Sequence, residues 1–433
     1  MTTSVTPLKQ KRNRKKDWKE DFHYSMNGMI KKNAHNMLLI FKNDENLKGK
    51  FAYNLLTRKS EIIGNVPWVR ADDSKTLSDF DDACLRNYIS VTYDIEAKEL
   101  IYDTLNEIIL QNKYHPIRDF LNKVRGKWDG ISRIDTLLID FFDAEDNELN
   151  RYQTRLALIG AVKRAFQSGC KFDYVLTLKG DQGLGKSSFF ERLAFNKEWF
   201  TDSLDEIRGK DAKEQIQGKW IIELGEMAAV GKGDQKRIKQ FITSTADEFR
   251  QSYGRRTNHF PRQCIFVATT NDDHPLKDDT GGRRWWIVEV KSRWFEKNKP
   301  LEVEQIWAEA VKIYDQMERN NEPLKLPNHL EEQAKKIQNE NTDKGLYSAE
   351  IEFILQRGYI EKSDINGAKI KEPINETCAY HVWSEVLGRY KHDINKATAR
   401  EINAVLKNLD GWECIGRRQF KDYGKQTIYK RIE

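Results

Sequence analysis

The stretch YVLTLKGDQGLGKSSFFERLA, residues 174–194, combines three local patterns. Its first part, YVLTL at 174–178, is a short apolar run with β-branched members, which is typical of a buried strand in a parallel sheet. Gly180–Ser187 follows directly and fits GxxxxGK[ST] at every fixed position. The residues SSFFERLA then continue as a helix. A strand, a glycine loop and a helix in this order form a phosphate-binding loop, so the stretch predicts an α/β fold.

The glycines, the lysine and the serine of this loop each have a physical role in holding a nucleotide. Gly183 and Gly185 let the backbone wrap a phosphate without a side-chain clash, and the backbone N–H groups supply positive potential. Lys186 would neutralise the β- and γ-phosphates, and Ser187 would bind Mg²⁺. We therefore expect ATP and Mg²⁺ as cofactors. The predicted ATP-binding residues are Gly180, Asp181, Gln182, Gly183, Leu184, Gly185, Lys186, Ser187 and Ser188.

Three further apolar runs indicate that the strand at 174–178 has neighbours in a parallel sheet: KWIIEL (219–224), CIFVATT (264–270) and RWWIVEV (284–290). Glu223 ends the first of these runs, and Glu226 lies one turn beyond. In a P-loop fold, carboxylates here hold Mg²⁺ and orient the attacking water. We assign Glu223 to the metal and Glu226 to water activation, although the sequence leaves the reverse open. A solvated charge at a strand end is the ordinary alternative.

Two more groups of polar residues complete the candidate catalytic set. Asn271 follows the run CIFVATT, where its amide could contact the γ-phosphate or the lytic water; an ordinary turn residue is the alternative. Arg283 and Arg284 lie between two glycines and an apolar strand. One of them could enter a neighbouring subunit's nucleotide site as an arginine finger, which would require an oligomer. Alternatively, the pair bridges Asp278 or Asp279 on the surface. Trp285 and Trp286 are expected in the core.

The charge of the chain is distributed in basic clusters, although its net value is only +6. We predict DNA as a partner, single-stranded or forked, because three clusters occur: one near the N-terminus, one at 250–262 with interleaved aromatics, and one at the C-terminus. For any single cluster, a solvated surface is the simpler interpretation. The candidate DNA-binding residues are Arg250, Arg255, Arg256, His259, Arg262, Arg417, Arg418, Lys421 and Lys425.

The pattern along the chain predicts five segments. They are a basic disordered leader (1–20), a mostly helical N-terminal domain (21–150), the α/β P-loop core (151–320), a helical linker (321–374) and a winged-helix-like domain (375–433). The last assignment rests on two helix patterns followed by two strands around a glycine-containing turn, an arrangement used for docking DNA or protein. For 21–150, a structural or oligomerisation module is expected, and the sequence does not identify its partner.

Composition excludes several classes of protein. No apolar run approaches the roughly 18–20 residues needed to span a bilayer, and no apolar stretch follows the basic N-terminal residues, so a secretory signal is not expected. The five cysteines are far apart, and neither a disulfide framework nor a zinc-type CxxC pair is visible. We therefore expect a cytoplasmic protein without a membrane partner, whose metal arrives with the nucleotide.

The motifs GDQGLGKS, KWIIELGEM, KRIKQFITSTADEFRQSYGRR, FPRQCIFVATTND and TGGRRWWIVEV occur in this order over residues 180–290. This set resembles the virulence-associated protein E family of phage- and pathogenicity-island ATPases, which are related to superfamily 3 helicases within the AAA+ class. The phrase EQIWAEAV (304–311) is also similar to that family. Weaker similarity extends back through YHPIRDFL and KWDGISRID.

The resemblance implies a ring-shaped hexamer that translocates on DNA in a bacterial host and initiates replication of a mobile element. It implies Gly180–Ser187 as phosphate loop, Glu223 or Glu226 as acidic motif, Asn271 as sensor, and Arg283 or Arg284 as the finger acting in trans. Some relatives carry a fused primase, but residues 1–150 show no paired-carboxylate strand motif, so a primase would be a separate partner. ELGE also departs from the adjacent acidic pairs of better-known superfamily 3 enzymes.

The hypothesis from the sequence is an ATP-dependent DNA helicase of a phage or mobile element. Two alternatives share every ATP motif: an ATPase switch that assembles on DNA or protein without unwinding, and a replication initiator whose ATP site drives assembly. A strand-displacement assay separates the helicase from both.

Overall fold

The computed structural model describes residues 17–204, 209–225, 232–250, 257–276, 282–342, 347–363, 369–420 and 424–432. The chain folds as two compact units. The first contains Met1–Met227, Lys236–Asn271 and Arg283–Ala334, and the second contains Ala228–Gln235, Asp272–Gly282 and Lys335–Glu433.

A five-stranded parallel sheet forms the centre of the first unit, with strand order β10-β4-β9-β6-β5. The strands are β4 (Val175–Lys179), β5 (Phe200–Thr201), β6 (Ile221–Leu224), β9 (Ile265–Thr270) and β10 (Trp285–Glu289). All four strands predicted from apolar runs are confirmed. The edge strand β5 was not predicted, because two residues carry no recognisable pattern. The chain is thus a mixed α/β protein, as expected.

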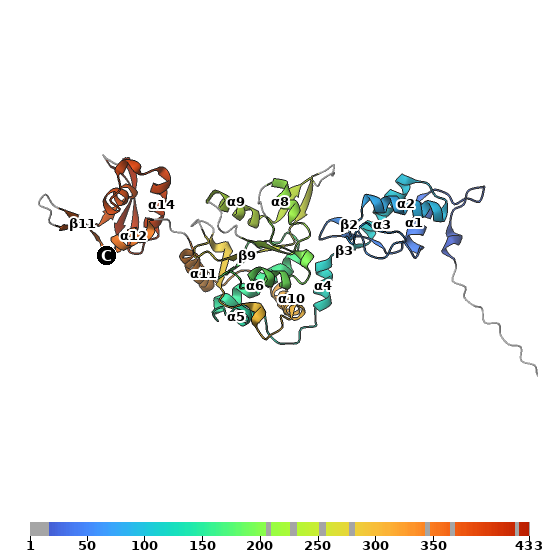
Figure 1. Ribbon diagram of the computed structural model, residues 1–433, viewed down its shortest axis with the longest axis horizontal. Helices are drawn as coiled ribbons and strands as arrows, with labels where there is room; N and C mark the ends of the chain where they lie inside the picture. Colours follow the sequence, from blue (N-terminus) through green and yellow to red (C-terminus); the bar gives the residue numbers. More distant parts are fainter. Residues whose placement is uncertain are drawn as a thin grey trace, which may run out of the picture. The chain divides into compact units, whose positions relative to one another are not determined.

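The long helix α6 (Glu148–Phe166) packs on this sheet and is itself covered by α10 (Val303–Asn320), as Figure 1 shows. The apolar residues of α6 are spread around its whole circumference, which is typical of a helix buried on all sides. The indole of Trp220 donates to the carbonyl of Ala161 at 3.0 Å and packs against Trp307, with ring centroids 4.2 Å apart and planes tilted by 33°. Sheet, α6 and α10 therefore share one core.

Shorter helices and turns connect these elements. Trp285 and Trp286 are buried in the sheet, as predicted. The shorter elements from residue 116 to 340 are α4 (Pro116–Val124) and α5 (Leu137–Phe142) before α6, α11 (Asn328–Glu340) after α10, and between them α7 (Lys186–Leu193), η2 (Lys197–Trp199), α8 (Gly209–Gln215), α9 (Lys232–Thr243), η4 (Gly282–Arg284) and η5 (Trp294–Glu296).

The N-terminal part of the first unit is mostly helical and contains a small sheet. It contains η1 (Trp18–Asp21), α1 (Ala34–Asn43), β1 (Phe51–Asn54), β2 (Lys59–Ile62), α2 (Asp79–Tyr93), α3 (Lys98–Gln111) and β3 (Lys113–Tyr114), with sheet order β2-β1-β3. Its hydrophobic core runs from Phe22 to Ile109. By contrast, α4 and α5 pack against α6. The predicted border at 150 is therefore too late, because it separates helices that share a core.

The predicted leader at 1–20 falls mainly outside the described residues. Its end, however, is ordered: Trp18 begins η1 and packs edge-on against Phe22, with ring centroids 5.3 Å apart. The aromatic ring of Trp18 joins the helical core and thereby extends the folded part to residue 18.

Part of the central basic cluster lies at a two-stranded antiparallel hairpin, β7 (Ala246–Phe249) with β8 (Asn258–Pro261). Arg262 follows it and is almost fully buried. Its guanidinium donates two hydrogen bonds to Asp247, at 2.7 and 2.8 Å, and lies over the ring of Phe241. The prediction that Arg262 contacts DNA is wrong, because this side chain is used inside the unit as a paired, buried charge.

The C-terminal residues of the second unit form helices and a three-stranded antiparallel sheet of order β13-β15-β14. The elements are α12 (Ser348–Arg357), β11 (Tyr359–Ser363), β12 (Lys369–Pro373), β13 (Glu376–Thr377), α13 (Ala379–His381), η6 (Val382–Val386), η7 (Lys391–Asp393), α14 (Lys396–Lys407), β14 (Trp412–Phe420) and β15 (Gly424–Arg431). The two predicted helix patterns and two strands are present, although η6 is a π-helical turn.

The predicted border at 375 cuts through a single core. Ile351 and Leu355 of α12 belong to the same buried cluster as Leu406 and Tyr429. The segment 321–374 was predicted to be a helical linker, but it also contains the antiparallel hairpin β11–β12. Its strands, YIEKS and KIKEP, are short and mostly polar, so neither an apolar run nor an alternating pattern marked them in the sequence. In the described part of the chain, no helix is long and apolar enough to cross a membrane.

We expect Arg262→Ala to destabilise the protein by about 3–5 kcal/mol, because it leaves the carboxylate of Asp247 buried without its partner. Chemical denaturation measures this loss. Arg250→Ala, at an exposed position on the same hairpin, is the matched control and should leave the free energy of unfolding nearly unchanged. Equal stability of the two variants would contradict a structural role for Arg262.

Candidate functional site

The glycine loop lies between the end of β4 and the start of α7, as the sequence order required. Gly183 and Gly185 both have positive φ, 86° and 78°, which glycine adopts without steric cost. Gly180 has a different reason to be glycine: a β-carbon there would lie 2.3 Å from the carbonyl oxygen of Val290. Loop and sheet therefore approach more closely than any side chain would permit.

The side chain of Lys186 lies within the curve of the loop. Its ammonium donates to the carbonyls of Gly180 at 2.6 Å and Asp181 at 2.7 Å. Lys186 is largely buried, and this burial lowers the pKa of its ammonium. A desolvated cation held by neutral carbonyls is well placed to exchange them for the oxygens of an anion.

Three side chains from three different elements meet beside the loop. The hydroxyl of Ser187, in the first turn of α7, donates to Oε1 of Glu223 at 2.8 Å. Thr269, near the end of β9, donates its hydroxyl to the same oxygen. They meet because β6 pairs in parallel with β9, so the carboxyl ends of both strands lie at one edge of the sheet.

Glu223 is buried with one of its oxygens unsatisfied. Its Oε2 atom has no hydrogen-bond partner within the described part of the chain. Burial raises the pKa of Glu223, and this effect outweighs the hydrogen bonds from the Thr269 and Ser187 hydroxyls, which lower the pKa. The orphaned oxygen and the adjacent Ser187 hydroxyl are the hard oxygen ligands that Mg²⁺ takes, so these residues fit that ion. No cluster of three or more His, Cys, Asp or Glu among the described residues could hold a metal by itself.

Sequence reasoning missed two residues of this site. Thr269 stands within the run CIFVATT, and its polar position next to the strand end was the available signal. Asp202 follows the edge strand β5, and its negative charge also raises the pKa of Glu223. No pattern marked Asp202, because β5 is too short to be recognised. Asp202 supplies a second carboxylate near Glu223, whereas Glu226, the predicted one, lies outside the described residues.

Asn271 comes directly after β9 and is exposed. The carbonyl of the preceding Thr270 accepts a hydrogen bond from the backbone N–H of Gly180 at 3.1 Å, so the end of β9 is joined to the start of the loop. The structure thus places Asn271, Lys186, Ser187 and Glu223 at one edge of the sheet.

The two candidate finger arginines have different surroundings. Arg284 donates to the hydroxyl of Thr243 at 3.0 Å and forms an ion pair with Asp173 at 3.3 Å. Both partners in that ion pair are mostly buried. Arg283, in contrast, is exposed. The proposed bridging partners Asp278 and Asp279 lie outside the described residues. These contacts favour Arg283 over Arg284 as the arginine that could reach another protomer.

The candidate DNA-binding residues that remain lie on two hairpins. Arg250, directly after β7, and His259, in β8, are exposed, and His259 lies beside Glu248 at 3.4 Å. Arg417, Arg418 and Lys425 are exposed on β14–β15, where Arg418 pairs with Glu376 at 2.9 Å. Arg255, Arg256 and Lys421 lie outside the described residues.

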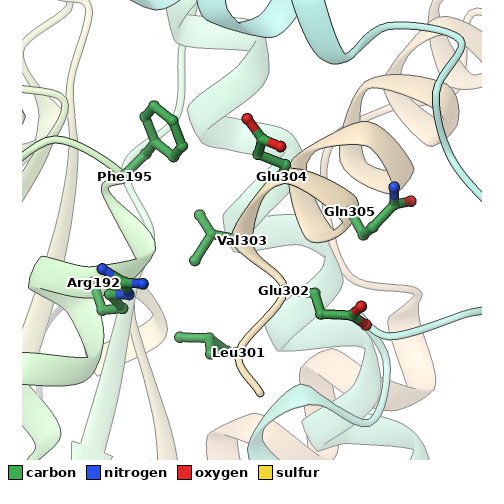
Figure 2. A pocket seen from close by; sticks show the side chains of 7 residues that line it. All are labelled: Arg192, Phe195, Leu301, Glu302, Val303, Glu304 and Gln305. Carbon is green, nitrogen blue, oxygen red and sulfur yellow. The ribbon is translucent and has the colours of Figure 1, made fainter.

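A pocket of about 360 Å³ opens at the far end of α7 (Figure 2). Arg192 and Phe195 line one side of it, and residues 301–305 at the start of α10 line the other. One of those residues, Glu302, is paired with Arg133 at 2.7 Å. None of the predicted site residues lines this pocket, which is separate from the loop at the N-terminal end of α7.

Comparison with known proteins identifies a family. The family model described as the virulence-associated protein E-like domain matches residues 121–343. A comparison with curated proteins gave no match. Among solved structures, an apo structure of the NrS-1 C-terminal region is similar with a TM-score of 0.44 and 13% identity, covering 88% of this chain and 96% of that one. Its A form gives 0.43 and 12% over the same shares.

We expect Glu223→Gln to raise the melting temperature of the metal-free protein by a margin that grows as pH rises from 4.5 through the folded-state pKa of Glu223. The folded-state pKa of Glu223 lies above its ordinary value of 4.5, so its stabilising contribution is present at low pH and is lost as pH rises through the folded pKa. The uncharged amide avoids this loss. Melting curves of both proteins across that range measure the difference. A constant difference between them would contradict the buried carboxylate.

Proposed function

The chain belongs to the virulence-associated protein E-like family, and from this premise we propose that it is an ATP-dependent DNA helicase of a phage or mobile element, working in DNA replication as a ring-shaped oligomer. The observation that carries the proposal is the junction of Lys186, Ser187 and Glu223 at the glycine loop. It brings together a phosphate-binding cation, a metal-binding hydroxyl and an unsatisfied carboxylate, which is what triphosphate hydrolysis needs.

In the proposed reaction, the backbone N–H groups at the start of α7 and the ammonium of Lys186 bind the β- and γ-phosphates. Ser187 and Glu223 would hold Mg²⁺, which supplies charge neutralisation on the phosphate oxygens. Because the Ser187 hydroxyl hydrogen is used by Glu223, its oxygen lone pairs remain available to a cation. Asn271 would orient the γ-phosphate or the attacking water.

Asp202 or Glu226 would polarise that water, because Glu223 is committed to the metal. Asp202 is exposed at the end of β5 and is charged close enough to Glu223 to shift its pKa. The exposed Arg283 would reach the nucleotide of a neighbouring protomer and stabilise the charge that develops during hydrolysis. An active site built from two protomers requires an oligomer, for which we propose a hexamer.

DNA would be gripped by exposed basic residues on the two hairpins, Arg250 and His259 on β7–β8 and Arg417 and Lys425 on β14–β15. The helices α13 and α14 followed by the antiparallel strands β14 and β15 support a winged-helix interpretation of the second unit, in which the hairpin β11–β12 is an addition after α12. These charges support DNA as the partner, because a nucleic-acid backbone is recognised by accessible cations.

We expect Lys186→Ala to abolish both ATP hydrolysis and the displacement of a strand from a forked duplex, because the variant loses the cation for the transferred phosphate. Phosphate release and gel-based strand displacement measure these two activities. Lys171→Ala, at an exposed position before β4, is the matched control and should retain both. Wild-type hydrolysis that DNA stimulates without any strand displacement would overturn the helicase and leave the ATPase switch.

We expect Arg283→Ala to bind ATP normally but to hydrolyse it about 10³–10⁵-fold more slowly. Mixing it with Lys186→Ala should restore part of the activity, since the Lys186→Ala protomers supply an intact Arg283 to the intact loops of the other variant. Arg319→Ala, at an exposed position on α10, is the control. Failure of the mixture to recover activity, in assemblies that light scattering shows to be mixed oligomers, would argue against a finger acting in trans.

A further inference from the structure

Two aromatic rings lie against the glycine loop and have no part in the chemistry proposed above. They belong to η5, the single turn that follows β10. The indole N–H of Trp294 donates to the Ser188 hydroxyl at 3.2 Å. A β-carbon on Gly185 would lie 2.8 Å from Nε1 of Trp294 and 2.9 Å from Cε1 of Phe295. Both rings therefore touch the last part of the loop and the first turn of α7.

The two rings form a corner. Their centroids are 6.1 Å apart and their planes meet at 81°. Trp294 is half-buried and meets Phe189 of α7 edge-on, with centroids 5.9 Å apart. The ring of Phe295 is 54% exposed. A flat heteroaromatic group fits such a corner, because it can stack on one ring while meeting the other through its edge.

The turn that carries this corner is tied to the fold on both sides. Before it, the backbone N–H groups of Lys291 and Ser292 donate to the carbonyl of Phe142, at 2.9 and 3.1 Å. After it, Lys297 pairs with Asp143 at 2.7 Å. Because these anchors hold the backbone at the end of α5, the rings are preorganised beside the loop rather than carried on an unattached segment.

We propose that Trp294 and Phe295 bind the nucleobase of the nucleoside triphosphate whose phosphates occupy the glycine loop. The proposal rests on the proposed ATPase function. Lys186 and Ser187 take the terminal phosphates, so the sugar and base leave the loop past Gly185 and Ser188, the two residues that the rings contact. Stacking on an aromatic face accepts any base, so this corner distinguishes a nucleotide from a bare polyphosphate.

The proposal also accounts for Gly185 in a second way. Its positive φ favours glycine in any loop of this shape. The closeness of both rings means that any side chain would in addition push the aromatic corner away from the loop. The distance between the glycine loop and the two rings therefore leaves no room for a β-carbon at Gly185.

Calorimetric titration of the full-length chain with Mg-ATP and with Mg-triphosphate tests the proposal. Phe295→Ala removes the exposed ring, and Trp294→Leu keeps an apolar contact with Phe189 while losing the stacking face. We expect each variant to bind ATP about 5- to 100-fold more weakly and to bind inorganic triphosphate as the wild type does. Phe80→Ala, which removes a ring that is 75% exposed elsewhere, should alter neither affinity.

The outcomes separate the two proposals. If the wild type binds neither ligand, the proposed ATPase function fails. If the wild type binds both ligands, and the two variants either retain wild-type ATP affinity or lose affinity for ATP and triphosphate equally, the nucleobase site is wrong. Light scattering of the same samples tests whether the two rings contact another protomer instead of a nucleobase. If the variants form oligomers of lower mass than the wild type but bind ATP with unchanged affinity, the rings contact another protomer, and the proposal is overturned. Lys186→Ala should weaken both ligands.

Discussion

The carboxylate of Glu223, held by the hydroxyls of Ser187 and Thr269, is the interaction on which the candidate site depends. It joins the end of β6 to the first turn of α7 and to β9, so it sets the position of the glycine loop against the sheet. Both hydroxyls bond to one carboxylate oxygen, and the other is buried without a partner. Such an unsatisfied group costs stability and is retained where function requires it.

This junction exists because the sheet is parallel and because β9 lies between β4 and β6. Residues 180, 223 and 271 are far apart in the chain, yet Gly180 and Asn271 directly follow β4 and β9 and Glu223 is the penultimate residue of β6, and these strands end at the same edge. The glycines then permit close approach: Gly180 meets the carbonyl of Val290, and Gly185 meets the rings of η5. In the proposed function, the phosphates would bind on the Glu223 side of the glycine loop and the base on the side of η5, both at the same edge of the sheet.

Arginines show how burial divides residues that look alike in sequence. Arg262, Arg283 and Arg284 all belong to basic motifs flanking β9 and β10. Arg262 is enclosed with Asp247 and Phe241, and Arg284 is held by Asp173 and Thr243, whereas Arg283 is exposed. A buried guanidinium must find a carboxylate within the fold, while an exposed one remains available to another molecule. The sequence shows these basic motifs, and the contacts in the structure show which arginines are buried within the unit.

Local patterns in the chain sufficed for the four apolar strands, the glycine loop with Lys186 and Ser187, and the placing of Glu223 and Asn271 at strand ends, because each of these depends on a few neighbouring residues. Tertiary structure decided the remaining features. These are the edge strand β5, the contribution of Thr269 and Asp202 to the site, the internal pairing of Arg262, and the placement of Trp294 and Phe295 over Gly185. They depend on side chains from distant segments meeting across the sheet. No spacing along the chain encodes which buried charge will find which partner, because burial is a property of the packed unit.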